Sequence, residues 1–254
     1  AADRLREAAS RRLVPLLVDV TKPAQVADAA KSLAEATGGK LDGLVNNAGI
    51  VMAAPMELLA LDALRTQFEV NVIGQLAVTQ ACLPLLRAAR GRIVNMSSIS
   101  GTVPYPLLGA YAASKCALNA LSETLRMELG RSGIHVASII PGAVATPIWE
   151  KSANRSQQNL SNAGTEELRR YAHLYDAMSG VLAWVGHHAI APEKVARSVE
   201  RALTAHWPRA RYYVGADARF MATLRVLLPE KLCDQLVVSS MLWLGRSHMP
   251  SRSD

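Results

Sequence analysis

Tyr111 and Lys115 stand four residues apart in the segment YAASK, at the start of a predicted helix. At this spacing both side chains project from one face of the helix, so the ammonium group lies near the phenol. A neighbouring positive charge favours the phenolate and lowers the pKa of a tyrosine from its usual value of about 10. The pair is therefore suited to general acid/base chemistry near neutral pH, although many helices carry this spacing by chance.

Ser98 ends an apolar run thirteen residues before Tyr111. A hydroxyl at the end of a strand can donate a hydrogen bond to a substrate oxygen while the tyrosine exchanges a proton with that oxygen. Taken alone, Ser98 could equally be a helix cap or a turn residue. A serine hydrolase is a poor interpretation, because the local sequence MSSISG lacks the Gly-x-Ser-x-Gly turn of such enzymes.

The elements that would position these side chains alternate along the chain, with short apolar runs between longer helical patterns. This alternation predicts an α/β fold whose parallel sheet is covered by helices on both faces. Strands are predicted over residues 13–19, 41–47, 91–98, 134–140 and 211–215. Helices are predicted over residues 23–36, 62–89, 110–131 and 192–205.

The first four apolar runs all close on residues that could contact a ligand. In an open parallel sheet, ligands bind beyond the carboxyl ends of the strands. The residues at these ends are Asp19, Asn46, Asn47, Ala48, Gly49, Ser97, Ser98, Pro141 and Gly142. We therefore expect one binding site along this rim of the sheet.

Composition narrows the class of protein. The 254 residues are half apolar and 19% charged, which suits one large domain with or without an appendage and excludes disordered and fibrous proteins. Three scattered cysteines predict a reducing, cytoplasmic location. The net charge of +7 contains no basic block, so nucleic-acid binding is only a minor alternative. His187 and His188 have no spaced partner ligands, so no metal site is expected.

Several of these motifs occur together in a fixed order. In sequence order they are Asp19-Val20, Asn46-Asn47-Ala48-Gly49, Asn71, Ser98, Tyr111, Lys115, Pro141-Gly142 and Thr146. In this order and spacing the chain resembles the short-chain dehydrogenase/reductase family over about residues 13–215. The resemblance implies a Rossmann-like doubly wound parallel sheet and an NAD(P)-dependent dehydrogenase or carbonyl reductase. NAD or NADP would be the cofactor, and the sequence does not distinguish the two.

The resemblance also implies a role for each catalytic residue. Tyr111 would be the acid/base, and Lys115 would lower the pKa of Tyr111 and hold the nicotinamide ribose. Ser98 would polarise the substrate oxygen. Asn71 would hold a water in a proton relay to Lys115, although without the family context a polar residue bending its helix is the simpler interpretation.

Further residues match cofactor-binding positions of the family. Asp19 would accept from the adenine amino group with the Val20 backbone beside it, unless Asp19 only caps the next helix. Small residues after the second run would let the cofactor approach the backbone, although Gly49 could serve only as a turn residue. The expected cofactor contacts are Asp19, Val20, Asn47, Ala48, Gly49, Tyr111, Lys115, Pro141, Gly142, Val144 and Thr146.

One element of the family pattern is missing from the sequence. The glycine-rich pyrophosphate loop and the first βαβ portion do not precede residue 13, and residues 13–19 would then lack both neighbouring strands. We therefore expect an N-terminally truncated version of the enzyme, with residues 1–215 forming an incomplete dinucleotide-binding and catalytic domain. The alternative is a non-catalytic truncated relative that acts through protein–protein contacts.

The substrate side is expected in two later segments. Residues 146–191 would form a lid over an apolar alcohol or carbonyl substrate, such as a steroid- or retinoid-like one, unless their apolar side chains belong to a core helix. The lid side chains are Ile148, Trp149, Tyr171, Leu174, Met178, Val181 and Trp184. Residues 216–254 would form a helical extension interrupted at Pro229, packed on the same chain, on a second subunit of a homo-oligomer, or weakly on a membrane surface.

Overall fold

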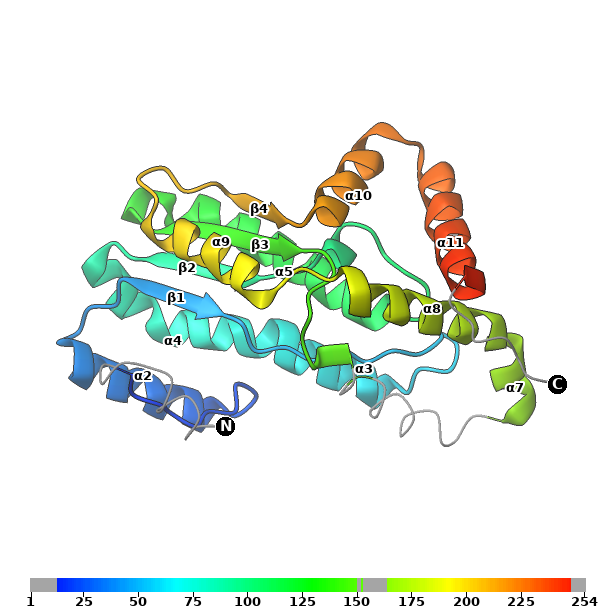
Figure 1. The fold of residues 1–254 in the computed structure, drawn as a ribbon. Coiled ribbons are helices and arrows are strands. Elements are labelled where there is room, and N and C mark those ends of the chain that lie inside the picture. Colours follow the sequence, from blue (N-terminus) through cyan, green and yellow to red (C-terminus); the bar gives the residue numbers. More distant parts are fainter. Residues whose placement is uncertain (1–12, 150–151, 153–163, 248–254) are drawn as a thin grey trace.

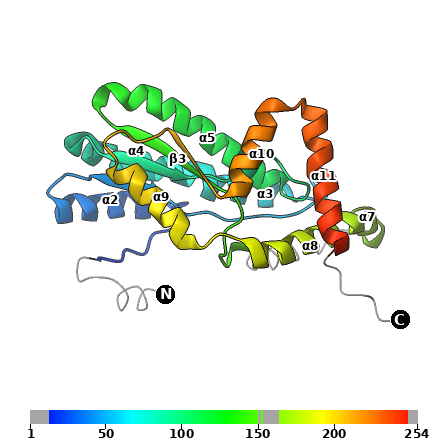
Figure 2. The ribbon, with the colours of Figure 1, turned by 45° about the horizontal axis from the view of Figure 1, so that its top comes forward.

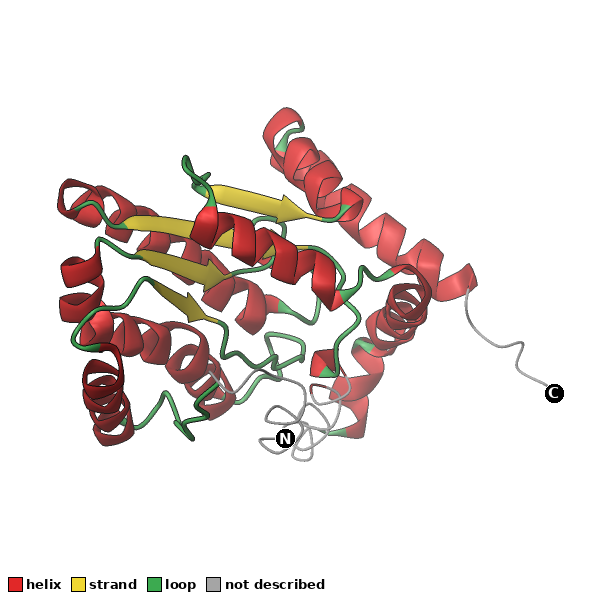
Figure 3. Ribbon diagram, turned by 60° about the vertical axis from the view of Figure 1, so that its left-hand side comes forward, coloured by secondary structure: helices red, strands yellow, loops and turns green. Residues whose placement is uncertain are grey.

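The computed structural model describes residues 13–149, 152 and 164–247, and it contains one sheet of parallel strands. The strands are β1 (Gly43–Asn46), β2 (Arg92–Met96), β3 (His135–Pro141) and β4 (Arg211–Val214), hydrogen-bonded in the order β1-β2-β3-β4. All pairs are parallel, so the carboxyl ends of the strands lie at the same edge of the sheet (Figure 3). The predicted α/β class and four of the five predicted strands are confirmed.

The helices beside these strands cover both faces of the sheet. The four predicted helical ranges agree with the structure to within three residues at each end, although residues 62–89 are divided into three helical segments. The helical elements are α2 (Pro23–Thr37), α3 (Leu61–Phe68), the π-helical segment η1 (Glu69–Ile73), α4 (Gly74–Ala89), α5 (Gly109–Leu129) and α9 (Pro192–Thr204). Short 3-10 turns are η2 (Ile99–Gly101) and η3 (Gly130–Ser132). Helices α4 and α5 lie behind the sheet and α9 lies in front of it in Figure 1.

Alternate strand residues fill a separate core on each face of the sheet. The face under α4 and α5 holds Cys82, Leu86, Ile93, Leu129, Ile134 and Val136. The face under α9 holds Val94, Ala137, Ile139, Val195, Ala202 and Val214. Because the strands are buried from both sides, their sequences read as continuous apolar runs.

The prediction of a strand over residues 13–19 is wrong. These residues form no strand, and the Leu17 side chain is fully exposed. A strand is stable only when a neighbour accepts and donates its backbone hydrogen bonds, and in the described part of the chain β1 pairs with β2 alone. The apolar composition of the run therefore leads to exposed side chains rather than to a buried strand.

The stretch Leu61–Ala89 is helical throughout and is long and apolar enough to cross a membrane by length and composition alone. In this fold it is a core element. Its α4 part packs against β1 on one side and against α2 on the other, and its residues Cys82 and Leu86 belong to the sheet core.

The C-terminal part of the chain forms a helical wall beyond the strand ends. It contains α7 (Thr165–Arg170), α8 (Ala172–His188), α10 (Ala216–Leu227) and α11 (Glu230–Ser247). Helices α10 and α11 are separated at Pro229, as the sequence predicts, and α11 packs across α8 (Figure 2). At the crossing a Cβ atom on Gly180 would lie 2.4 Å from the Gly245 Cα, so only glycine permits this approach of the two helices.

Candidate active site

Ser98 lies just beyond the end of β2, where the chain turns into η2. Its Oγ accepts a hydrogen bond from the Ser100 N–H at 3.2 Å, so it caps this short turn. The Ser98 side chain also hydrogen-bonds the Tyr111 phenol. The capping interpretation of Ser98 is therefore confirmed, and the same hydroxyl lies beside Tyr111, while its role toward a substrate remains a prediction.

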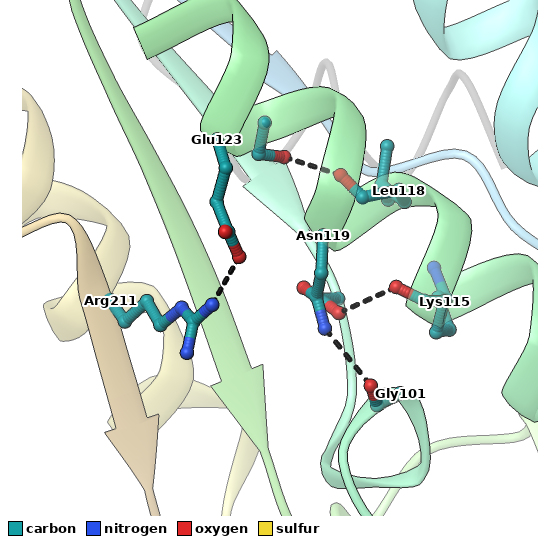
Figure 4. A network of polar contacts seen from close by, with 8 residues as sticks. Gly101, Lys115, Leu118, Asn119, Glu123 and Arg211 are labelled. Carbon is teal, nitrogen blue, oxygen red and sulfur yellow. Dashed lines mark hydrogen bonds and ion pairs between the residues drawn. The ribbon is translucent and has the colours of Figure 1, made fainter. Parts of the chain in front are cut away.

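The turn after Ser98 is fastened directly to α5. A Cβ atom on Gly101 would lie 2.8 Å from the Lys115 carbonyl carbon, so glycine is required for this contact. The Asn119 amide donates to the Gly101 carbonyl at 3.2 Å, one turn further along α5 (Figure 4). These contacts set the position of Ser98 relative to the first turns of α5, which carry Tyr111 and Lys115.

Tyr111 is buried at the start of α5, with 8% of its surface exposed. Burial raises the pKa of the phenol, and the hydrogen bond with Ser98 opposes that rise. The sequence suggested the opposite direction, because it placed an ammonium group next to the phenol. In the structure the Lys115 Nζ is 5.7 Å from the ring centroid, and loss of solvation outweighs it. Without other charges in the site, Tyr111 is a protonated phenol near neutral pH.

Lys115 is also buried, with 4% of its surface exposed. Burial lowers the pKa of its ammonium group to about 8. The Nζ donates to the Met96 carbonyl at 2.7 Å and is thereby held against the end of β2. A buried lysine of this kind remains mostly protonated at pH 7 and provides a positive charge inside the site.

Asn71 lies in the π-helical segment η1 and is fully buried. Its Oδ1 accepts from the Ile50 N–H at 2.9 Å, and its Nδ2 donates to the Ile50 carbonyl and to Ser114 Oγ, each at 3.0 Å. Ser114 in turn donates to the Tyr111 carbonyl at 2.7 Å. The side-chain amide therefore joins the loop after β1 to the start of α5. The water-holding role remains a prediction.

The segment after β1 approaches the candidate catalytic side chains closely. A Cβ atom on Gly49 would lie 3.5 Å from Asn71 Oδ1 and 3.6 Å from Lys115 Nζ. The Ala48 carbonyl accepts from the Gln75 amide of α4, which fixes the backbone at this point. Both distances are ordinary van der Waals contacts, so the interpretation of Gly49 as only a turn residue stays open.

A buried polar network that sequence reasoning missed holds the ends of β1 and β2 in register. Asn46 Nδ2 donates to Asn95 Oδ1 and to Thr79 Oγ1, both at 2.8 Å. Asn95 Nδ2 donates to Ser122 Oγ of α5, also at 2.8 Å. The available signal was one polar residue, Asn95, inside the otherwise apolar run of β2.

A cavity of about 770 Å³ opens at the carboxyl ends of the strands. Nine of the predicted site residues line it, namely Asn47, Gly49, Ser98, Tyr111, Lys115, Pro141, Gly142, Val144 and Thr146. Ala48 and Asn71 support this lining from outside. The cavity continues along the groove between β1 and α9, where Val45, Val199 and Leu203 form an apolar floor.

Asp19 and Val20 are not part of this lining. Asp19 is exposed, and its Oδ1 accepts from the N–H and the hydroxyl of Thr21, which lowers its pKa. It does not cap α2, whose N-cap is Lys22. Val20 packs at the start of α4, where a Cβ on Gly74 would lie 2.8 Å from both the Val20 Cγ2 and its carbonyl oxygen. Their role in binding adenine remains a prediction.

A second cavity, of about 850 Å³, lies between the rim and the C-terminal helical wall. Ser98, Gly142 and Trp149 line both cavities, so the two spaces meet beside Ser98. Of the predicted lid side chains, Trp149, Met178, Val181 and Trp184 line the second cavity, and Ile148 lines the first. Tyr171 instead hydrogen-bonds Glu57, and Leu174 packs on the core formed by Leu107, Ala177 and Met241. The helix α8 thus has both a cavity face and a packing face.

The first cavity suits the nicotinamide and ribose half of a dinucleotide. Its lining includes Gly49 and Gly142, and the buried Lys115 and the Ser98 and Tyr111 hydroxyls supply polar contacts. The adenosine and pyrophosphate half has no comparable cradle among the described residues, because Asp19 and Val20 lie outside the cavity.

Comparison with known proteins supports this arrangement. Residues 1–157 match the family model for short chain dehydrogenases. The "3-amino-tetrahydro-pyrrolizinone reductase" of Xenorhabdus hominickii is 39% identical over 178 residues, which are 70% of this chain and 62% of that protein. "Estradiol 17-beta-dehydrogenase 2" of Mus musculus is 36% identical over 245 residues, or 93% of this chain and 64% of that protein. The chain thus spans less than two thirds of the length of these two relatives.

The fold is also similar to a solved structure. A short chain dehydrogenase from Burkholderia cenocepacia J2315, in complex with NADP, superposes with a TM-score of 0.67 and 25% sequence identity. The similarity covers 90% of this chain and 80% of that one.

Proposed function

The chain belongs to the short-chain dehydrogenase family, whose members use NAD or NADP, and we propose that it interconverts an apolar secondary alcohol and its ketone. The observation that carries this proposal is the single cavity that brings Ser98, Tyr111 and Lys115 together at the strand ends. The cofactor, when bound, would supply or accept the hydride. The residues of the chain would place the substrate oxygen and move its proton.

Tyr111 would act as the proton donor during ketone reduction. Burial raises its pKa and keeps the phenol protonated until a carbonyl oxygen arrives. As the substrate oxygen gains negative charge, the phenol proton passes to it, and the resulting phenolate is stabilised by the Lys115 ammonium group nearby. In alcohol oxidation the phenolate would take the hydroxyl proton by the same path.

Ser98 would orient the substrate oxygen beside Tyr111. It lies where the two cavities meet, so it can contact a substrate held in the second cavity and a reacting centre in the first. Its hydroxyl is already fixed by the Ser100 N–H and the Tyr111 phenol, so little reorganisation is needed when the substrate binds.

The second cavity favours a large apolar substrate. Its volume of about 850 Å³ and its many apolar side chains fit a rigid polycyclic molecule, with a few polar groups such as Tyr105 and Ser240 for orientation. A relative named for estradiol supports a steroid-like substrate. We therefore expect a steroid alcohol or ketone to be preferred over a small one such as acetone.

The test is cofactor-dependent turnover. The protein is assayed for oxidation of NADH and NADPH with a panel of ketones that runs from acetone and cyclohexanone to steroid ketones. We expect turnover that rises with the apolar surface of the ketone and is lost in Tyr111→Phe. Unchanged turnover in Tyr111→Phe would exclude the assigned mechanism, and binding of neither cofactor would favour the non-catalytic alternative.

A further inference from the structure

The Asp217 carboxylate lies in a narrow space at the junction between the sheet and the C-terminal helical wall. Asp217 is the second residue of α10, and its Oδ2 accepts a hydrogen bond from the Ala143 N–H at 2.8 Å. A Cβ atom on Gly142 would lie 1.9 Å from Oδ2, and one on Gly215 would lie 2.3 Å from Oδ1. The carboxylate thus occupies the space that two glycines leave open.

The segment held by Asp217 is the loop that follows β3. The Gly142 N–H donates to the Val214 carbonyl at 3.0 Å, and the Ala143 carbonyl accepts from the Ile190 N–H at 2.9 Å. Ala145 completes this bridge by donating to the Ile190 carbonyl at 3.1 Å. The Ala143 N–H, in contrast, donates its hydrogen bond to a side chain, the Asp217 carboxylate of α10.

This loop borders both cavities, whereas Asp217 borders the second. Gly142 lines both cavities, Val144 lines the first, and Asp217 and Ala143 line the second. A shift of the carboxylate would therefore move the backbone that borders the cofactor side. The loop after β3 is thus bonded to the first turn of α10 through Asp217 and to the end of β4 through the Val214 carbonyl.

We propose that Asp217 is a positioning residue that holds the loop at residues 142–144 in the conformation that receives the nicotinamide end of the cofactor. This inference rests on the proposed function and adds a residue that does not touch the reacting atoms. A carboxylate suits the task because it is an acceptor only, so the oxygen that faces the Ala143 N–H brings no competing donor. Its position in the first turn of α10 also places its negative charge at the positive end of the helix dipole.

The proposal is tested with two substitutions of the same side chain. Asp217→Ala removes the acceptor, and we expect cofactor affinity to fall about 10-fold, as for loss of one charge-assisted hydrogen bond. Asp217→Asn keeps an oxygen that can accept from the Ala143 N–H, and we expect it to recover most of the affinity. Asp234→Ala removes an exposed carboxylate from the neighbouring helix α11 and serves as the control.

Two readouts are independent of turnover. Titration of NADH or NADPH fluorescence gives the cofactor Kd, and hydrogen exchange of the peptide that contains Ala143 reports the loop directly in the cofactor-free protein. We expect faster exchange at Ala143 in Asp217→Ala alone. In steady-state assays the KM for the cofactor should rise more than the KM for the ketone, whereas a residue that served only stability would lower the Tm and leave both KM values unchanged.

Each outcome decides the question. Wild-type exchange and wild-type cofactor affinity in a folded Asp217→Ala would overturn the proposal. If Asp217→Ala does not fold, Gly142→Ala displaces the same carboxylate from the opposite side, and normal exchange at Ala143 in that variant would overturn it instead. If the wild-type protein binds no cofactor, the proposed function fails, while the exchange measurement still tests the Asp217 contact.

Discussion

The two sides of the site are built in different ways. The candidate catalytic rim is held by directional hydrogen bonds between polar side chains and backbone groups, as at Ser98, Asn71 and Lys115. The helical wall opposite is held by apolar packing and by the close glycine crossing of α8 and α11. Hydrogen bonds fix positions to fractions of an ångström, whereas apolar surfaces can slide and repack. The chemistry is therefore expected to tolerate little change, and the substrate range is expected to change readily.

The largest effect is expected at the rim. Tyr111→Phe removes the phenol that we propose as the proton donor, and a positioned acid or base contributes about 10²–10⁴-fold in rate. We expect kcat to fall by roughly this factor with little change in the KM for the ketone, because the ring still fills its buried position. Steady-state kinetics measure both values. If the KM for the ketone rises by this factor and kcat does not fall, Tyr111 binds substrate rather than transferring the proton. The rim and the wall would then not differ in function as described.

The charge on Lys115 gives the rim a pH signature in stability. Its pKa is about 8 in the folded chain against 10.5 for an ordinary lysine, so between these values the unfolded chain binds more protons. Stability contributed by this residue therefore rises with pH over that window, by up to ~2 kcal/mol between pH 7.5 and 9.5. Burial raises the pKa of Tyr111, so this residue makes stability fall with pH. That opposite effect begins only above about pH 10, the ordinary pKa of tyrosine.

Urea unfolding of the wild type and of Lys115→Met at several pH values measures this difference. As the pH falls from 9.5 to 7.5, the free energy of unfolding of the wild type should decrease by up to ~2 kcal/mol, and Lys115→Met should lack this decrease. Lys31→Met, which removes an exposed lysine on α2, is the control and should follow the wild type. Parallel curves for all three proteins would contradict the assigned burial of the charge.

At the wall, a bulky residue in the helix crossing should separate binding from chemistry. In Gly180→Leu the side chain would collide with the Gly245 backbone, and overpacking of this kind costs about 1–3 kcal/mol. We expect a lower Tm and a raised KM for large ketones, with cofactor Kd unchanged. Gly186→Leu lies on the same helix with nothing within 4 Å of its Cβ position and should leave all three values near the wild type. A rise in the cofactor Kd of Gly180→Leu as large as the rise in its KM for large ketones would show that the helical wall also determines the geometry of the rim.

The same contrast explains what sequence reasoning could and could not predict. The rim motifs depend on short spacings within one helix or at one strand end, so Ser98, Tyr111 and Lys115 were placed correctly in one cavity. Periodicity predicted the helices and four strands because each buried face repeats locally. The strand prediction for residues 13–19 failed because a strand needs a neighbouring strand, and a local apolar run does not show whether one is present.

Contacts between distant segments were beyond the sequence. The bond from Ala143 to Asp217 joins residues 74 apart, and the Asn46–Asn95 bond joins residues 49 apart. Nothing in the local pattern of α8 or α11 indicates that Gly180 meets Gly245. The direction of the Tyr111 pKa shift was wrong for a related reason, since the spacing shows the nearby lysine but not the depth of burial that outweighs it.

The smallest effect is expected where the wall is exposed. Phe220 on α10 lines the second cavity yet keeps 62% of its surface exposed, so replacing it should cost little stability. In Phe220→Ser we expect the KM for large ketones to rise about 3-fold, equivalent to ~0.6 kcal/mol of lost apolar contact, while the KM for cyclohexanone and the Tm stay the same. Val226→Ser, on the same helix and 83% exposed, lines neither cavity and is the matched control. If both substitutions raise the KM equally, the apolar substrate contacts the exposed surface of α10 in general. The substrate site would then extend beyond the second cavity.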